Sequence, residues 1–432
     1  MKNLNRHFKF VEELSGVLHY MHKQNGLQVL LWQDKSAPVV ALNVTYLVGS
    51  RNEAVGHTGS THLLEHLMFK GSKKYNRKTG KLIDKIVFGM GAKSNATTSF
   101  DRTNYWELFP KARLSELMTL EADRMRGAIL KEADKVSEMT VVRNEFERWQ
   151  NNNTEVLEME VWATAFREHP YHHPTIGWRS DIENVSIERL RSFYNDFYWP
   201  NNAYVTVAGD VEPSEALTLI DKHFGGIRKS ARPIPPMHTI EPVQEGERLV
   251  TVSRAGEVPV LMLAHKVPPA LASDTSALEI LAGVLGKGHS SRLYRALIDA
   301  GLATSVSTRN MAFHDGGLFV TTVQIVPGKD IDQVERVVLA EYGNVIGNGI
   351  TSEELEREKY NATVEQAFAK DGPLGLVSIL NEAIAIGDWK IAMNYGDILG
   401  KVRGESVQAV AVKYLIPNSL TIGHFIPKQA GP

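Results

Sequence analysis

The chain has 432 residues, of which 43% are hydrophobic and 23% charged, and its formal net charge at pH 7 is −2. This composition is typical of a globular protein with room for two or more hydrophobic cores, and it gives no indication of a nucleic-acid or membrane partner. No run approaches about 18 apolar residues, so no membrane-spanning helix is expected, and the absence of cysteine excludes disulfides and thiolate metal ligands.

The N-terminal segment 1–16 is polar and lacks the apolar core of a signal peptide. The compartment is therefore unknown: cytoplasmic by default, or periplasmic if a signal peptide has been removed. After this segment, residues 27–32 and 39–48 are rich in β-branched and other apolar side chains and predict two strands around a turn at 34–38.

The next segment reads His62-Leu63-Leu64-Glu65-His66. On a helix, two histidines four residues apart share one face, so both imidazoles can reach one Zn²⁺ at about 2.0–2.1 Å. Glu65 can then lie beside the metal without ligating it, where a general base is needed for a water molecule. This spacing is the inverted form of the commoner His-Glu-x-x-His motif and predicts a metal-dependent hydrolase.

The flanks of the motif weigh against a chance cluster on a surface helix. Leu67 and Met68 continue the apolar positions within the motif, so the helix is expected to be mostly buried. Unpaired histidines and carboxylates are costly in such a setting unless they bind a metal or each other. Ser60 or Thr61 is expected to cap the start of this helix.

Residues 95–106 are predicted to form a strand pair, and helices are expected at 111–126 and 134–150. A catalytic zinc usually takes three protein ligands, and the second of these helices is rich in carboxylates. Glu138 and Glu145 are seven residues apart and share one face, so one can ligate while the other supports a histidine. Spacing alone does not separate Glu145, Glu147 and Glu138, and a solvated acidic helix is the alternative.

The rest of the chain repeats an order of strands, helix, strands, helices and a final strand. Four prolines between positions 233 and 242 mark an extended linker. The order before and after this linker is a weak internal repeat. We therefore expect two domains, 1–229 and 248–432, joined by the linker 230–247. The remaining elements are expected as helices at 187–198, 213–224, 274–300 and 405–414, and as strands at 203–210, 249–252, 260–265 and 419–425.

Two further polar segments carry weaker signals. Gly286–Ser291 lacks the spacing of a phosphate-binding loop and predicts a helix break instead. The histidine-dense segment Tyr171–Pro174 has no nearby carboxylate pattern and is expected to lie in a loop or at the surface rather than to bind a second metal.

The segment Gly59–Ser72 closely resembles the active-site helix of the pitrilysin and insulinase metallopeptidases (family M16). That family's second block, Glu-Arg-x-x-Val-x-x-Glu, matches Glu138 to Glu145, with Val142 at the valine and Met139 in place of the arginine. The resemblance implies one Zn²⁺ per chain, with Glu145 as the third ligand and Glu138 as the supporting carboxylate.

The same resemblance covers nearly the whole chain and implies an α+β fold. Two tandem, structurally similar α/β-sandwich domains (LuxS/MPP-like) are expected, with zinc only in the first, as in short two-domain bacterial members and processing-peptidase β-subunits.

Asn95, Ala96 and Thr97 resemble the family's edge strand, which binds an extended peptide as one more strand. The implied function is a zinc endopeptidase for peptides or unfolded segments. The alternatives are a processing peptidase for one precursor and, less compatible with an intact ligand set, a non-catalytic assembly subunit.

The second domain departs from the family pattern at its arginine and, seven residues later, its tyrosine, a pair thought to stabilise the oxyanion. Alignment on Gly301–Thr304 puts Thr304 at the tyrosine and Leu297 at the arginine. We therefore expect a homologous M16 chain to supply the pair in a heterodimer, with a homodimer as the alternative and with no nucleic-acid or membrane partner.

Overall fold

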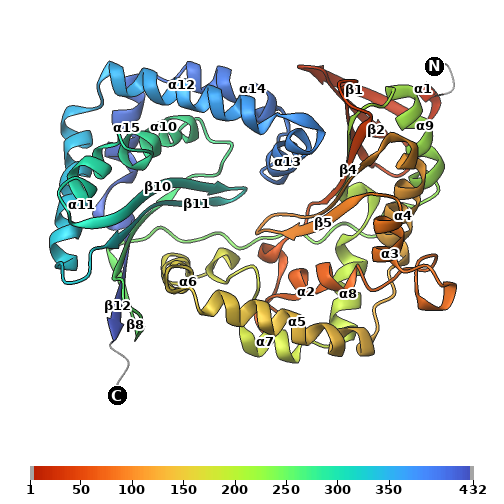
Figure 1. Ribbon diagram of the computed structural model, residues 1–432, viewed down its shortest axis with the longest axis horizontal. Helices are drawn as coiled ribbons and strands as arrows, with labels where there is room; N and C mark the ends of the chain where they lie inside the picture. The colour runs from red at the N-terminus through yellow and green to blue at the C-terminus, as the bar shows by residue number, and fades with distance from the viewer. Residues whose placement is uncertain (1–3, 429–432) are drawn as a thin grey trace. The chain divides into compact units, whose positions relative to one another are not determined.

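The computed structural model describes residues 4–428 (Figure 1). The outermost residues of the two predicted domains, 1–3 and 429–432, lie outside the described part. The chain forms two compact units, each built on one β-sheet with helices packed against it. The predicted α+β class is confirmed.

Unit 1 comprises the described residues up to Phe146, Pro174–His238 and Ala367–Met393. Its seven-stranded sheet has the order β1-β2-β3-β7-β4-β6-β5, in which only the β3–β7 pairing is parallel. The strands are β1 (Phe8–Leu14), β2 (Val17–His22), β3 (Gln28–Gln33), β4 (Val39–Tyr46), β5 (Lys93–Thr98), β6 (Thr103–Pro110) and β7 (Ala203–Gly209).

Helices cover both faces of this sheet. One face packs against helices of the first half of the chain, among them α2 and α4. The other is covered by α13, whose Leu376, Leu380 and Ile384 lie in one cluster with strand residues such as Leu30 and Ala41. Burial on both faces explains why β4 reads as a near-continuous apolar run rather than as an alternating one. The helices of this unit are α1 (Leu4–His7), α2 (Ser60–Leu67), α3 (Ile83–Gly89), α4 (Leu114–Gly127), α5 (Glu132–Gln150, whose last turn belongs to unit 2), α7 (Arg179–Asn184), α8 (Ile187–Phe197), α9 (Pro213–Phe224) and α13 (Gly372–Ala385).

Unit 2 comprises Glu147–His173, Thr239–Gln366 and the described residues from Asn394 onward. Its five-stranded sheet has the order β10-β11-β9-β12-β8, with β12 and β8 parallel. The strands are β8 (Arg248–Ala255), β9 (Val260–Val267), β10 (Ala303–Phe313), β11 (Gly316–Ile325) and β12 (Leu420–Lys428). The helices are α6 (Asn153–Ala165), α10 (Thr275–Gly286), α11 (Ile331–Asn348), α12 (Ser352–Ala369, whose last three residues belong to unit 1), α14 (Lys390–Gly400, whose first four residues belong to unit 1) and α15 (Gly404–Tyr414).

Each unit contains one helix from the opposite half of the chain. In unit 2, α6 packs on β12, where a Cβ added to Gly423 would lie 2.4 Å from Val161 Cγ2, so glycine is needed for this close approach. In unit 1, α13 packs on β4 and β7. The boundaries at 229 and 248 remain a proposal about the two halves of the sequence, whereas the compact units are defined by packing and include these exchanged helices.

Most predicted elements are present, and the structure differs from the sequence prediction in two places. The β1–β2 hairpin was not predicted. The helical region expected at 274–300 is interrupted, because α10 ends at Gly286 and a short π-helical turn follows at Tyr294–Ile298. A Cβ at Gly286 would lie 2.3 Å from Thr308 Oγ1, so the chain passes close to β10 there, and the predicted helix break is confirmed. Among the described residues, no helix combines the length and apolar character needed to cross a membrane.

Candidate metal centre

Helix α2 carries the His-x-x-Glu-His motif, and its start is held by a residue that the sequence did not single out. Glu53 is buried and accepts hydrogen bonds from the backbone N–H groups of Gly59 (2.7 Å) and Thr61 (2.6 Å). Burial raises the pKa of Glu53 to about 8, although these hydrogen bonds act in the opposite direction. The two oxygens of Glu53 thereby satisfy two donors at the helix N-terminus.

The expected cap by Ser60 or Thr61 is wrong. The N-cap is Gly59, with a left-handed φ of 80°, and no side chain of its own caps the helix. A Cβ at Gly59 would lie 2.3 Å from the carbonyl oxygen of Ile176, so a serine or threonine does not fit at this N-cap. The hydroxyl of Ser60 donates instead to the carbonyl of His57.

The three expected ligands lie together in unit 1. Glu145 Oε1 lies 3.7 Å from His62 Nε2, and Glu145 Oε2 lies 3.4 Å from His66 Nε2. One ligand atom from each residue lies within 4.8 Å of the others. Donors about 2.0–2.1 Å from a tetrahedral zinc are roughly 3.3 Å apart, so the arrangement fits Zn²⁺ with little movement.

Glu138 contacts this group through His66. Its Oε1 lies 3.0 Å from His66 Nδ1, while its other oxygen pairs with Lys70. A carboxylate on Nδ1 fixes the tautomer that leaves Nε2 free to ligate. Glu147, the third carboxylate left open by spacing, is exposed and lies outside the group.

The two histidines differ in their electrostatic surroundings. Burial, together with the neighbouring His66, lowers the pKa of His62 to about 4, although Glu145 acts in the opposite direction. Burial also lowers the pKa of His66, but hydrogen bonds to Glu145 and Glu138 outweigh this effect and raise it above its ordinary value. His62 is therefore already in the neutral form that metal binding requires, whereas His66 must lose a proton when a metal binds at lower pH.

Glu65 points toward strand β5 rather than into the ligand group. Its Oε2 accepts a 2.5 Å hydrogen bond from the Thr98 hydroxyl, and α2 contacts β5. Burial raises the pKa of Glu65, while the bond from Thr98 lowers it. The carboxylate is thus next to the histidines but oriented by the sheet edge.

Strand β5 is an edge of the unit 1 sheet and contains the expected substrate-binding residues. Asn95 and Thr97 are exposed, and Ala96 is buried. Ser99 N donates to Arg102 O, which fixes the hydrogen-bonding pattern between β5 and β6. Because backbone groups alternate in direction along an antiparallel ladder, the N–H and C=O groups of Ala96 point away from β6. These groups are available to an added strand.

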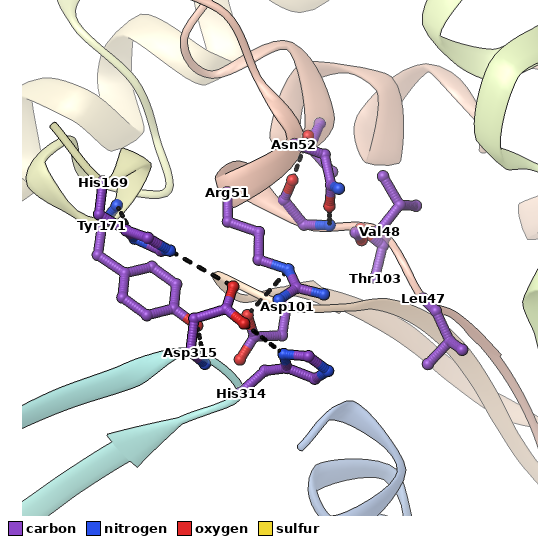
Figure 2. Close-up of polar contacts among 12 residues, drawn as sticks. Leu47, Val48, Arg51, Asn52, Asp101, Thr103, His169, Tyr171, His314 and Asp315 are labelled. Carbon is purple, nitrogen blue, oxygen red and sulfur yellow. Dashed lines mark hydrogen bonds and ion pairs between the residues drawn. The ribbon is translucent and has the colours of Figure 1, made fainter. Parts of the chain in front are cut away.

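Two neighbouring features brace this edge, and neither was predicted. Arg102 donates to the Thr97 carbonyl (2.9 Å) and pairs with Glu382 of α13 (2.5 Å). Figure 2 shows the second feature, the loop at 49–52, in which Arg51 pairs with Asp101 at 3.3 Å. A Cβ at Gly49 would lie 2.2 Å from Phe100 O, so the loop packs directly on the β5–β6 hairpin.

Other residues singled out from the sequence lie in unit 2. Leu297 is fully buried in the core of that unit, and Thr304 is exposed and donates to Gln324 O. Tyr171 lies in a short 3-10 helix (Pro170–His172), and His173 follows it. Both are buried rather than at the surface, and the Tyr171 hydroxyl accepts from the backbone N–H of Asp315 (Figure 2). Among the described residues, none of these belongs to a metal-ligand group.

Comparison with known proteins gives consistent matches along most of the chain. Residues 28–178 match the profile of "Insulinase (Peptidase family M16)", and residues 184–361 match "Peptidase M16 inactive domain". The zinc protease PqqE of Helicobacter pylori is 35% identical over 344 residues, which cover 78% of this chain and 77% of that protein. An uncharacterized zinc protease of Streptomyces coelicolor is 25% identical, covering 94% of this chain and 89% of its own length.

Solved structures give the same result. The crystal structure of a protease from Helicobacter pylori matches with a TM-score of 0.91 at 30% identity, covering 96% of this chain and all of that one. A peptidase M16 inactive domain from Pseudomonas fluorescens matches with a TM-score of 0.84 at 17% identity, covering 96% and 99%, which supports the fold alone.

Proposed function

Because the chain belongs to the M16 family of insulinase-type peptidases, we propose that it is a zinc-dependent endopeptidase that hydrolyses peptides or unfolded segments. The observation that carries this proposal is the convergence of His62, His66 and Glu145, with Glu65 on the same helix as the two histidines and next to an edge strand. A chain that had become a non-catalytic subunit would have no reason to keep this set of donors together.

His62, His66 and Glu145 would hold one Zn²⁺ per chain, with Glu138 orienting His66. A zinc ion bound there lowers the pKa of a water molecule and polarises a carbonyl oxygen. Glu65 would accept the proton of the attacking water and pass it to the leaving amine. Thr98 orients the Glu65 carboxylate for this role through its hydrogen bond.

Strand β5 would bind the substrate as an extended peptide. The outward backbone groups of Ala96 can pair with a peptide strand, and the exposed Asn95 and Thr97 flank it. Recognition through backbone groups places few demands on substrate side chains, which suits varied unfolded segments. A dedicated processing peptidase would share this chemistry. It would be distinguished by cleavage of one folded precursor in preference to a panel of unstructured peptides.

We also propose that a homologous chain completes the active site. In family members that carry the arginine and tyrosine, the pair is thought to stabilise the oxyanion, and this kind of contribution is typically about 10²–10³-fold in kcat. Leu297 is buried and apolar, and Thr304 has no phenol, so neither can replace the pair. Peptide hydrolysis should therefore rise when a homologous chain carrying the pair is added. A homodimer that is fully active alone would contradict this part of the proposal.

The experiment that tests the function compares Glu65→Gln with Glu279→Gln. The first substitution keeps the shape of the side chain but leaves an amide that cannot accept a proton, so hydrolysis should fall by about 10²–10⁴-fold or more while zinc content stays at the wild-type level. Glu279, a largely buried carboxylate of unit 2, is the matched control, and its variant should keep both properties. Near wild-type hydrolysis by Glu65→Gln would show that Glu65 is not the base.

A further inference from the structure

We propose that His7, His22 and Asp221 form a second site for a divalent transition-metal ion in unit 1. Asp221 Oδ1 lies 2.9 Å from His7 Nδ1 and 3.0 Å from His22 Nε2. One ligand atom from each residue lies within 4.8 Å of the others. Donors on a tetrahedral zinc are roughly 3.3 Å apart, so the distance from Asp221 to each histidine would have to grow by only a few tenths of an ångström to admit the ion.

The three side chains come from elements that the fold brings together independently of any metal. His7 ends α1, directly before β1, and His22 ends β2. In the β1–β2 hairpin, Phe8 pairs with His22, and Lys23 N donates to His7 O at 2.8 Å. Asp221 lies in the last turn of α9, which contacts α1 (Figure 1). The donors are therefore fixed by a strand pair and a helix rather than by a loose loop.

Packing restricts the movement of these donors further. The His22 ring is fully buried, and the Phe8 ring meets it edge-on with centroids 5.0 Å apart. The side chain of Asn25 donates to the carbonyls of Phe224 (2.9 Å) and Ile227 (3.0 Å), which ties the turn after β2 to the end of α9. Donors held in this way are preorganised for binding.

The donor set and its exposure suit a metal with one open position. Two imidazoles and one carboxylate are borderline ligands that favour zinc, nickel or copper over magnesium or calcium. The side chains of His7 and Asp221 are 36% and 32% exposed, which leaves a path for an ion, while His22 closes the inner side.

A hydrogen-bonded cluster without metal is the alternative. In that cluster one carboxylate oxygen serves both histidines. A metal would replace the shared hydrogen bonds with stronger contacts. The bound ion would also link the β1–β2 hairpin, at the edge of the sheet, to helix α9, whose Asp221 comes 199 residues after His22.

The test uses the full chain with the first centre removed by His62→Ala and His66→Ala. Titration of this metal-free protein with zinc chloride should show about one bound ion per chain, and the midpoint of thermal unfolding should rise with zinc concentration. Adding His7→Gln or Asp221→Asn should abolish both effects. His19→Gln is the matched control, because His19 lies on the same strand but bonds to Gln28, and this variant should keep them.

A second measurement does not depend on how the added variants fold. Crystals of the His62→Ala/His66→Ala protein, soaked in zinc chloride, should give an anomalous peak at the zinc edge between His7, His22 and Asp221. The absence of this peak, or zinc binding that persists unchanged in both Asp221→Asn and His7→Gln, would overturn the proposal.

Discussion

Helices α2 and α10 occupy the same place in their respective units. Each follows a pair of strands, precedes an antiparallel pair and contacts the edge strand of that pair, which is β5 in unit 1 and β10 in unit 2. Each also carries one largely buried carboxylate that accepts a hydrogen bond from the edge strand. Thr98 donates to Glu65 at 2.5 Å, and Asn310 donates to Glu279 at 2.9 Å. Burial raises the pKa of both carboxyl groups, that of Glu279 to about 7.

The difference lies in what surrounds that carboxylate. Helix α10 is apolar on nearly all sides and has no histidine, whereas α2 places His62 and His66 beside Glu65, and α5 adds Glu145. A largely buried carboxylate next to an edge strand is thus a property that both units share. The histidines and Glu145 distinguish the candidate metal centre, and burial of Glu65 alone would be weak evidence for catalysis.

The largest expected effect comes from removing the ligands that α10 lacks. His62→Ala and Glu145→Gln should each lose most of the zinc and lower peptide hydrolysis by about 10³-fold or more, because the metal contributes several kcal/mol to transition-state stabilisation. Elemental analysis and a peptide-cleavage assay measure the two losses. Full zinc occupancy in both variants would show that the ligands have been wrongly assigned.

The starts of the two helices offer a second contrast. Glu53 satisfies two N–H groups of α2, whereas the N-cap of α10, Asp274, makes no capping bond and instead pairs with Lys413. Glu53→Gln should destabilise the protein by roughly 1–3 kcal/mol, because the amide nitrogen would face a donor. Asp274→Asn should cost at most about 1 kcal/mol, as expected for an exposed pair. Urea unfolding measures both, and equal losses would remove the contrast.

Among the described residues, no carboxylate faces the buried His265, and its pKa is shifted in the opposite direction from that of His66. His265 on β9 is buried beside Ser419, and burial lowers its pKa to about 3. As the pH falls, this histidine is protonated in the unfolded chain, where its pKa is near 6.5, before it is protonated in the folded protein. The stabilising contribution of the neutral, buried His265 is therefore present above about pH 6.5 and is lost as the pH falls toward 3. Between pH 7 and 5 the loss should be about 2 kcal/mol. Replacement by His265→Gln should remove that part of the pH dependence, and an unchanged slope in urea unfolding would contradict it.

The smallest expected effect concerns the edge strand itself. Ala96→Pro removes one outward N–H of β5 and leaves its pairing with β6 intact, so kcat/KM for peptides should fall about 5–10-fold, the equivalent of one hydrogen bond. Ala96→Gly, which keeps the N–H, should retain most of the activity. If both variants lose activity equally, packing of the side chain matters rather than strand addition.

The sequence was most informative where chemistry depends on local spacing. The four-residue separation of the histidines and the seven-residue separation of Glu138 and Glu145 follow from helix geometry, and the structure places these side chains together. The cap by Glu53 and the pairing of Arg102 with Glu382 could not be predicted, because they depend on tertiary contacts. Arg102 and Glu382 are 280 positions apart, and no local pattern connects them. The choice of Glu145 over Glu147 came from the family resemblance rather than from spacing.

The exchange of helices between the halves also affects how the protein is made. During synthesis, the last residue of α9, Phe224, is added first. Helix α13 covers one face of the unit 1 sheet, and its last residue, Ala385, is added 385 − 224 = 161 residues later. At about 5–20 residues per second, this face stays uncovered for on the order of ten seconds or more. The nascent chain therefore exposes an apolar sheet surface during synthesis, and the yield of folded protein should depend on how well that surface is shielded until α13 emerges.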